Sequence, residues 1–131
     1  MSAAHSSEFE DLVDSMRPRV TEITLEETKR RLAENPKAIL VDVREDGEWE
    51  KGRARGAVHM GRGVIERDIV ARVPEKNTEL ILYCGGGYRS VLAAVNLQAM
   101  GYSRVRSLIG GFRNMQAGGF PMEGGGGCGC P

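Results

Sequence analysis

Residues 79–90 read Glu-Leu-Ile-Leu-Tyr-Cys-Gly-Gly-Gly-Tyr-Arg-Ser. The first five residues form an apolar run of the kind found in a strand that is buried on both faces of a parallel sheet. Cys84 and three glycines follow, and the stretch from Ser90 to Met100 has the apolar spacing and the good helix formers of an α-helix. This order predicts one strand-loop-helix unit of an α/β domain, with Cys84 at the carboxyl end of the strand.

The rest of the chain repeats this alternation of strands and helices. Thr24 and Glu27 have the spacing of a capping box, so we expect a helix over 25–34 that stops before Asn35-Pro36. Further elements are expected as strands at 38–43, 57–60 and 105–109, and as helices at 8–16, 45–50, 64–73 and 112–117. We therefore predict an α/β fold with a small, mainly parallel sheet flanked by helices on both sides.

Composition argues against several classes of protein. The 131 residues suffice for one domain with its own core. The 18 Lys and Arg residues balance 18 Asp and Glu residues without a basic block, so no nucleic-acid partner is expected. No apolar stretch is long enough to cross a bilayer and the N-terminus is acidic, which predicts a cytoplasmic protein that does not associate with membranes. Three cysteines do not indicate a disulfide framework.

The two ends of the chain differ from its middle. We expect residues 1–20 to form an N-terminal extension with a short amphipathic helix, and residues 21–122 to form the folded domain. Residues 123–131 are rich in glycine and have little to bury, so a flexible tail is expected. Its Cys128 and Cys130 are either a resolving or relay pair that acts with Cys84, or part of a disordered appendage whose thiols bind soft metals weakly.

The surroundings expected for Cys84 favour a reactive thiolate. Glycine permits positive φ angles, so the N–H groups of Gly85, Gly86 and Gly87 can converge on one point, and the following helix adds the positive end of its dipole. Converging amides and a nearby arginine, here Arg89, stabilise a thiolate, and the same cradle suits the charged outer sulfur of a persulfide. An unpaired cysteine is most often a small core residue, but that role explains neither the glycines nor the arginine.

Four stretches, in the right order along the chain, resemble the rhodanese-type sulfurtransferases: residues 41–45, 52–59, 84–90 and 108–111. They are similar to the family's Asp-Val-Arg motif, its Gly-His-Ile-Pro-Gly-Ala-x-His segment, its active-site loop and its closing Gly-Gly. Arg53 and Arg55 stand where the family usually has His and Pro, and Met115 stands where tryptophan is frequent. The resemblance spans residues 21–122 and implies the rhodanese fold, with five short parallel strands.

The resemblance implies that Cys84 takes a sulfane sulfur from thiosulfate or polysulfide and passes it, as a persulfide, to cyanide, sulfide or a thiol. It implies no metal and no organic cofactor. The expected partners are small sulfur anions, thiol or cyanide acceptors, and a protein that donates or accepts sulfur. Two alternatives stay open: a docking or regulatory rhodanese module without activity, and a cysteine-dependent phosphatase or arsenate reductase. The six-residue loop from Cys84 to Arg89 disfavours the second, because related phosphatases carry one residue more.

Other side chains are expected to complete the site. The expected substrate-binding residues are Gly85, Gly86, Gly87, Tyr88, Arg89, Ser90 and Arg62. Arg89 either binds the anionic donor or forms a salt bridge with Asp42 or Glu45 that holds the loop. Arg62 resembles a basic residue near the pocket of polysulfide sulfurtransferases, although a solvated arginine would give the same pattern. Asp42 lies in an apolar run and must be paired, so we expect it to support the site structurally together with Arg44.

Overall fold

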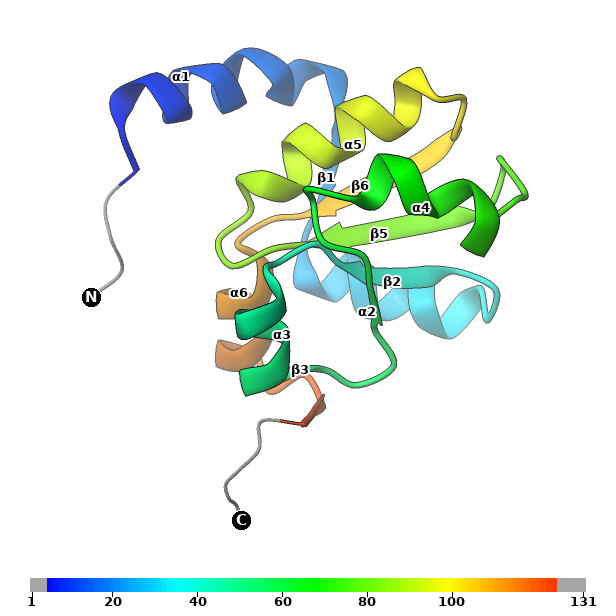
Figure 1. The fold of residues 1–131 in the computed structure, drawn as a ribbon. Helices are drawn as coiled ribbons and strands as arrows, with labels where there is room; N and C mark the ends of the chain where they lie inside the picture. The colour runs from blue at the N-terminus through cyan, green and yellow to red at the C-terminus, as the bar shows by residue number, and fades with distance from the viewer. Residues whose placement is uncertain (1–4, 125–131) are drawn as a thin grey trace.

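A computed structural model describes residues 5–124 (Figure 1). Its helices are α1 (Ser7–Met16), α2 (Leu25–Glu34), α3 (Asp46–Lys51), α4 (Ile65–Arg72), α5 (Arg89–Ala99) and α6 (Gly111–Ala117), with a 3-10 turn η1 at Arg17–Arg19. Its strands are β1 (Thr21–Ile23), β2 (Ile39–Asp42), β3 (Arg53–Ala54), β4 (Val58–His59), β5 (Glu79–Tyr83), β6 (Arg104–Leu108) and β7 (Met122–Glu123). Within residues 5–124, no helix has the length and apolar character needed to cross a membrane.

Five strands form one parallel sheet in the order β1-β6-β5-β2-β4. β5 lies in the centre, where Leu80 pairs with Val105 of β6 and with Ile39 of β2. All five residues of β5 are buried, as the apolar run predicts for a strand covered on both faces. Cys84 therefore follows the central strand at its carboxyl end, which is where open α/β sheets bind their ligands.

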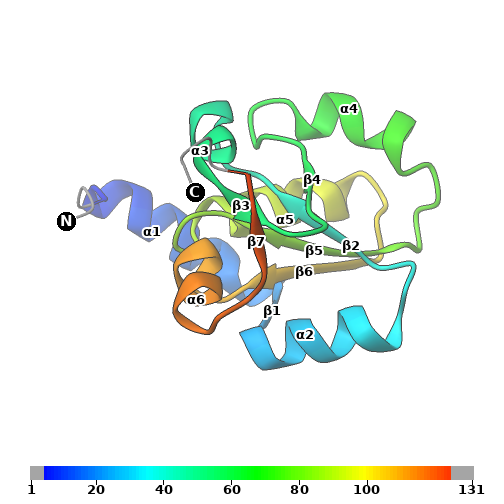
Figure 2. The same cartoon turned by 90° about the horizontal axis from the view of Figure 1, so that it is seen from below.

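Helices cover both faces of the sheet because side chains alternate along β5. Leu80 and Leu82 belong to one core with residues of α4 and α5, whereas Ile81 and Tyr83 belong to a second core with residues of α2 and α6. Figures 1 and 2 show α4 and α5 on one side of the sheet and α2 and α6 on the other. The predicted α/β fold with a mainly parallel sheet is confirmed.

The local signals in the sequence agree with most of these elements. α2 spans the predicted 25–34, and the Thr24 hydroxyl accepts the backbone N–H of Glu27 at 3.1 Å. Gly101 ends α5 with a φ of +105°, as expected of a left-handed cap. The sequence patterns do not predict β1 or the antiparallel pair of β3 and β7, because strands of two or three residues are too short to show a period.

The N-terminal helix α1 packs against α5 (Figure 1). Val13 is fully buried against Val91 and Leu92, and Phe9 borders the same cluster. The Ser6 hydroxyl accepts the backbone N–H of Phe9 at 3.1 Å and so caps the start of the helix. This amphipathic segment is therefore part of the packed structure.

Candidate active site

Cys84 is 1% exposed and lies between the end of β5 and the start of α5. Its Sγ accepts the backbone N–H of Gly87 at 3.1 Å. The hydroxyl of Ser90 lies 3.5 Å from Sγ and 2.8 Å from the hydroxyl of Ser107, which belongs to β6. One backbone amide, one hydroxyl and the N-terminal end of α5 thus surround the sulfur.

The three loop glycines play different parts. Gly87 has a φ of +92°, and a Cβ there would stand 2.9 Å from the backbone nitrogen of Gly110. Gly85 and Gly86 do not take positive φ, so the expected nest of successive left-handed turns is limited to Gly87. The N–H groups of Gly85 and Gly86 donate to no group among the described residues, which leaves them available to a bound anion.

The first turn of α6 is joined to the loop through backbone contacts. The N–H of Phe112 donates to the carbonyl of Cys84 at 2.7 Å, and the N–H of Arg113 donates to the carbonyl of Gly85 at 3.1 Å. Gly111 allows this approach, because a Cβ there would stand 2.2 Å from the carbonyl oxygen of Cys84. The Gly-Gly pair after β6 is therefore needed to bring α6 against the loop.

Arg89 is held by an acidic residue of α3. Its guanidinium donates to both carboxylate oxygens of Glu48, at 2.8 and 3.1 Å. The hydrogen bonds from Arg89 lower the pKa of Glu48 although partial burial opposes this, and the same bonds raise the pKa of Arg89. Arg89 therefore forms a salt bridge, but the predicted partners Asp42 and Glu45 are wrong. Glu48 takes that place, because Asp42 is occupied by Arg44.

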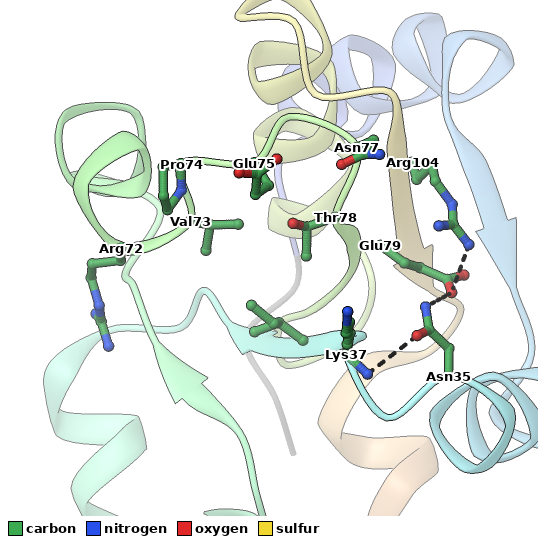
Figure 3. A pocket seen from close by; sticks show the side chains of 11 residues that line it. Asn35, Lys37, Arg72, Val73, Pro74, Glu75, Asn77, Thr78, Glu79 and Arg104 are labelled. Carbon is green, nitrogen blue, oxygen red and sulfur yellow. Dashed lines mark hydrogen bonds and ion pairs between the residues drawn. The ribbon is translucent and has the colours of Figure 1, made fainter.

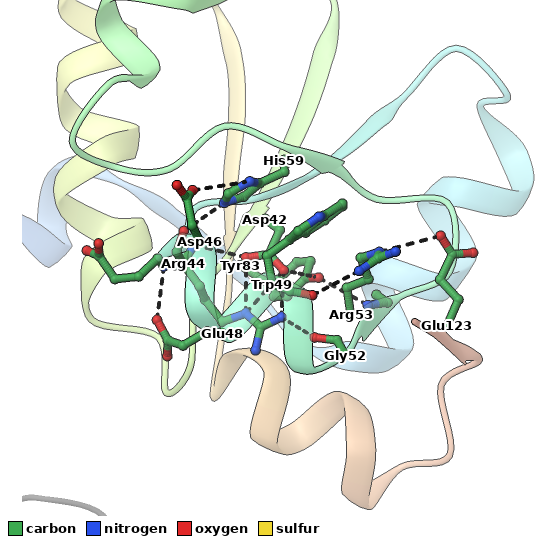
Figure 4. A network of polar contacts seen from close by, with 12 residues as sticks. Asp42, Arg44, Asp46, Glu48, Trp49, Gly52, Arg53, His59, Tyr83 and Glu123 are labelled. Atoms are coloured by element: carbon green, nitrogen blue, oxygen red, sulfur yellow. Dashed lines mark hydrogen bonds and ion pairs between the residues drawn. The ribbon is translucent and has the colours of Figure 1, made fainter. Parts of the chain in front are cut away.

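Asp42, Arg44 and Tyr83, the last residue of β5, form a buried polar cluster (Figure 4). Arg44 Nη2 lies 2.8 Å from the Asp42 carboxylate and donates to the carbonyl of Gly52 at 2.6 Å. The Tyr83 hydroxyl donates to Asp42 at 2.5 Å, and burial together with this bond raises the pKa of Tyr83. The guanidinium of Arg44 also lies 4.0 Å from the ring centroid of Phe112. The expected pairing of Asp42 with Arg44 is present, and it links β2 to the turn after α3.

Tyr88 contacts the N-terminal segment. Its ring centroid lies 4.4 Å from that of His5 and 5.9 Å from that of Phe9. The guanidinium of Arg17 lies 5.1 Å from the same ring. The loop is thus bordered on this side by residues that precede the first strand.

Arg62 lines a groove beside the segments that follow β2 and β4. Its backbone N–H donates to the carbonyl of Val43 at 3.0 Å. The groove is lined by segments 44–47 and 61–64 together with Arg67. The described residues lining it include Arg44, a predicted supporting residue, but none of the Cys84 loop. The structure therefore places Arg62 beside Arg44 and not among the loop residues predicted to bind substrate.

The structure brings three further residues to the loop: Glu48, Ser107 and Arg113. Glu48 had a local signal, because it follows Glu45 at the spacing of a capping box, and its carboxylate accepts the N–H of Glu45 at 3.0 Å. Ser107 and Arg113 had none, because their place beside the loop arises from the pairing of β6 with β5 and from the docking of α6.

The predicted tail cysteines Cys128 and Cys130 lie outside the described residues. Cys84 is a free cysteine. Within the described part of the chain, no group of three or more His, Cys, Asp or Glu side chains is arranged to hold a metal ion.

A larger cavity opens at the opposite edge of the sheet (Figure 3). It is lined by Glu79, the first residue of β5, whereas Cys84 follows the last residue of that strand. Glu79 is 2% exposed and pairs with Arg31 at 2.7 Å and Arg104 at 3.4 Å. Burial opposes its ionisation, but hydrogen bonds from Asn35 and Arg31 lower the pKa of Glu79 on balance. Because parallel sheets bind ligands at the carboxyl edge, the loop at Cys84 and not this cavity is the candidate active site.

Curated proteins with similar sequences include several sulfurtransferases. The chain is 32% identical over 103 residues to a protein from Allochromatium vinosum named a sulfurtransferase, covering 79% of this chain and 94% of that protein. It is 34% identical over 106 residues to the thiosulfate sulfurtransferase GlpE of Actinobacillus succinogenes, covering 79% of this chain and 90% of that protein. It is 32% identical over 95 residues to YrkF of Bacillus subtilis, covering 72% of this chain but 50% of that relative's length.

A solved structure and a domain profile also match the chain. A protein from Rhodopseudomonas palustris, described as being of unknown function and a possible tyrosine phosphatase, is 26% identical with a TM-score of 0.77. The alignment covers 94% of this chain and 99% of that protein. The profile of the rhodanese-like domain matches residues 24–117, from the cap of α2 to the end of α6. The chain belongs to the rhodanese-like domain family.

Proposed function

We propose that the protein is a sulfurtransferase in which Cys84 carries a sulfane sulfur as a persulfide. One observation carries this proposal: the buried Sγ accepts the N–H of Gly87 while the N–H groups of Gly85 and Gly86 have no described acceptor. Such amides stabilise a thiolate and a persulfide anion alike. The names of the Allochromatium and Actinobacillus relatives support the same activity.

The proposed reaction consists of two displacements at sulfur, and each bond that forms is matched by one that breaks. The thiolate of Cys84 attacks the sulfane sulfur of thiosulfate, a new S–S bond forms at Sγ, and sulfite leaves with the electron pair of the broken bond. A thiolate, sulfide or cyanide acceptor then attacks the outer sulfur and returns Cys84 to a thiolate. Polysulfide serves in the first step by the same displacement, with a shorter polysulfide as leaving group. Neither step needs a cofactor or an external oxidant.

The other loop residues have supporting roles in this proposal. The N–H groups of Gly85, Gly86 and Gly87 bind the anion, and Ser90 places its hydroxyl at Sγ. Arg89 orders the loop through Glu48. Cys128 and Cys130 are candidate acceptors within the same chain: Cys128 takes the outer sulfur, and Cys130 then displaces it as hydrosulfide to leave a disulfide.

The proposal is tested by intact mass after incubation with thiosulfate and removal of excess reagent. We expect the Cys128→Ser/Cys130→Ser variant, whose tail cannot discharge the persulfide, to gain the mass of one sulfur atom, and the same variant with Cys84→Ser to gain none. Cys84→Ser should keep its melting temperature, because the substitution is nearly isosteric, and should form no thiocyanate from thiosulfate and cyanide. A protein that gains no sulfur from thiosulfate or polysulfide, forms no thiocyanate and hydrolyses no phosphate ester would instead be a docking module.

A second candidate function is a cysteine-dependent phosphatase, which the description of the Rhodopseudomonas protein favours. The loop disfavours it, because Glu48 neutralises the charge of Arg89 that a phosphate would need. Hydrolysis of p-nitrophenyl phosphate that depends on Cys84, without persulfide formation, would support the phosphatase.

A further inference from the structure

Arg113 lies beside the Cys84 loop, in the first turn of α6. Its backbone N–H donates to the carbonyl of Gly85 at 3.1 Å, which fixes its backbone relative to the loop. Its guanidinium lies against Gly86: a Cβ built on Gly86 would stand 3.8 Å from Nη2 and 3.9 Å from Nη1 and Cζ. The charged group therefore lies beside Gly86, one of the two loop residues whose N–H has no described acceptor.

The other arginines near the loop are neutralised. Arg89 is paired with both oxygens of Glu48, and the lowered pKa of Glu48 keeps that carboxylate charged at neutral pH. Arg44 is buried against Asp42. Arg113 is exposed and forms no ion pair among the described residues. Among the described arginines beside the loop, Arg113 is therefore the one whose charge is uncompensated.

Resting on the proposed function, we propose that Arg113 binds the oxyanion end of the sulfur donor. A guanidinium presents a planar fork of donors that matches the oxygens of a sulfonate group. Thiosulfate carries such a group at one end and the transferable sulfur at the other. When the oxygens of thiosulfate bind Arg113, its sulfane sulfur faces the loop. The sulfite product then leaves from Arg113, which is exposed. Arg113 thus selects donors that carry an oxyanion over polysulfide, which has none.

The first test compares donors in steady-state transfer to cyanide, using the full chain. Arg113→Gln should raise the KM for thiosulfate roughly tenfold, the loss expected for one hydrogen bond to a charged group, with little change in kcat. The thiosulfate KM of Arg113→Lys should lie between those of the wild type and Arg113→Gln, because lysine keeps the charge but not the planar fork of donors. The KM for polysulfide should change much less. The control is Arg55→Gln, which removes the same charge from another exposed arginine.

The second test does not require sulfur transfer. Iodoacetate and iodoacetamide alkylate thiols by the same displacement, but only iodoacetate carries an oxyanion. We expect Arg113→Gln to lower the ratio of the iodoacetate rate to the iodoacetamide rate at Cys84 severalfold, and Arg55→Gln to leave this ratio unchanged. Mass spectrometry of the Cys84 peptide measures both rates. An unchanged ratio and thiosulfate KM in Arg113→Gln would overturn the inference. A lowered ratio in a protein that forms no persulfide would refute the sulfurtransferase function and leave anion binding by Arg113 standing.

Discussion

Gly86 and Gly87 are adjacent in the loop, but the backbone conformation requires glycine only at Gly87. Gly87 takes a φ of +92° and passes so close to Gly110 that a Cβ would stand 2.9 Å from its nitrogen. Gly86 does not take a positive φ, and a Cβ there would make ordinary contact with Arg113 at 3.8 Å. Gly87 is also the residue whose N–H reaches the sulfur of Cys84.

We therefore expect Gly87→Ala to be far more harmful than Gly86→Ala. A side chain at positive φ costs on the order of 1–2 kcal/mol, and the clash with Gly110 would move the N–H away from Sγ. Persulfide formation should fall at least tenfold in Gly87→Ala, whereas Gly86→Ala should keep most of its activity and its melting temperature. Equal losses in the two variants would show that the Gly87 N–H is not what holds the sulfur.

The Glu48–Arg89 pair predicts a pH dependence of stability. Both side chains are partly exposed, so the pair should contribute about 0.5–1 kcal/mol at pH 7. Because the folded-state pKa of Glu48 is lowered, this contribution is present above the ordinary carboxyl pKa and is lost as the pH falls through the lowered value. The deficit of Glu48→Gln in unfolding free energy should be constant between about pH 7 and 5 and shrink below about pH 4.

Urea unfolding at several pH values measures this deficit. The control is Glu50→Gln, which changes an exposed carboxylate of the same helix and should have little effect at any pH. A deficit of Glu48→Gln that stayed constant down to about pH 3 would contradict an ionic role for the pair.

At the scale of elements, α1 extends the core beyond the region that matches the domain profile, which begins at residue 24. It packs its buried Val13 on α5, and α5 begins at the Cys84 loop. The same N-terminal segment supplies the aromatic contacts of Tyr88. Loss of α1 would therefore affect the loop as well as the core.

We expect Val13→Ala to destabilise the protein by about 1–3 kcal/mol, since it leaves a cavity between two helices. Leu12→Ala is the matched control: Leu12 precedes Val13 on the same helix but is 46% exposed, so it should change stability little. Thermal unfolding measures both. Hydrogen exchange should also show faster exchange at Tyr88 in Val13→Ala, and an unchanged loop would mean that α1 does not order it.

At the scale of the whole molecule, the carboxyl edge of the sheet is assembled from segments far apart in the chain. Figure 4 shows α3, β3 and the C-terminal segment meeting around Arg53, which lies 4.5 Å from the ring centroid of Trp49 and 3.8 Å from Glu123. A groove lined by Glu48, Phe112 and Gly124 runs along this side. Its wall includes Phe112, whose N–H donates to the carbonyl of Cys84.

This groove leads from the start of the tail toward the loop and motivates a test of Cys128 and Cys130. If they accept sulfur from Cys84, removing residues 125–131 should slow the release of sulfide from the persulfide at least tenfold when no external thiol is added. The double variant Cys128→Ser/Cys130→Ser should behave in the same way, and its persulfide should still form. Release at the full rate in both variants would exclude the relay.

Local sequence was sufficient for the fold class and for the position of Cys84 at the carboxyl end of the central strand. The buried strand β5, the helix α2 with its Thr24 cap and the Gly101 turn all follow from residues within a few positions of one another. The same holds for Cys84 with its glycines and for Asp42 with Arg44, two residues away. Such features are predictable because apolar runs, caps and glycine conformations act over one turn or one strand.

The surroundings of the loop required the folded chain. Glu48 and Arg89 are separated by 41 residues, and Arg89 pairs with Glu48 instead of the expected Asp42 or Glu45. The contact of Arg113 with Gly86, the packing of α1 beside Tyr88 and the short pair of β3 with β7 likewise join segments distant in sequence. No local pattern encodes these neighbours, because each arises from how strands and helices dock once the hydrophobic cores have formed.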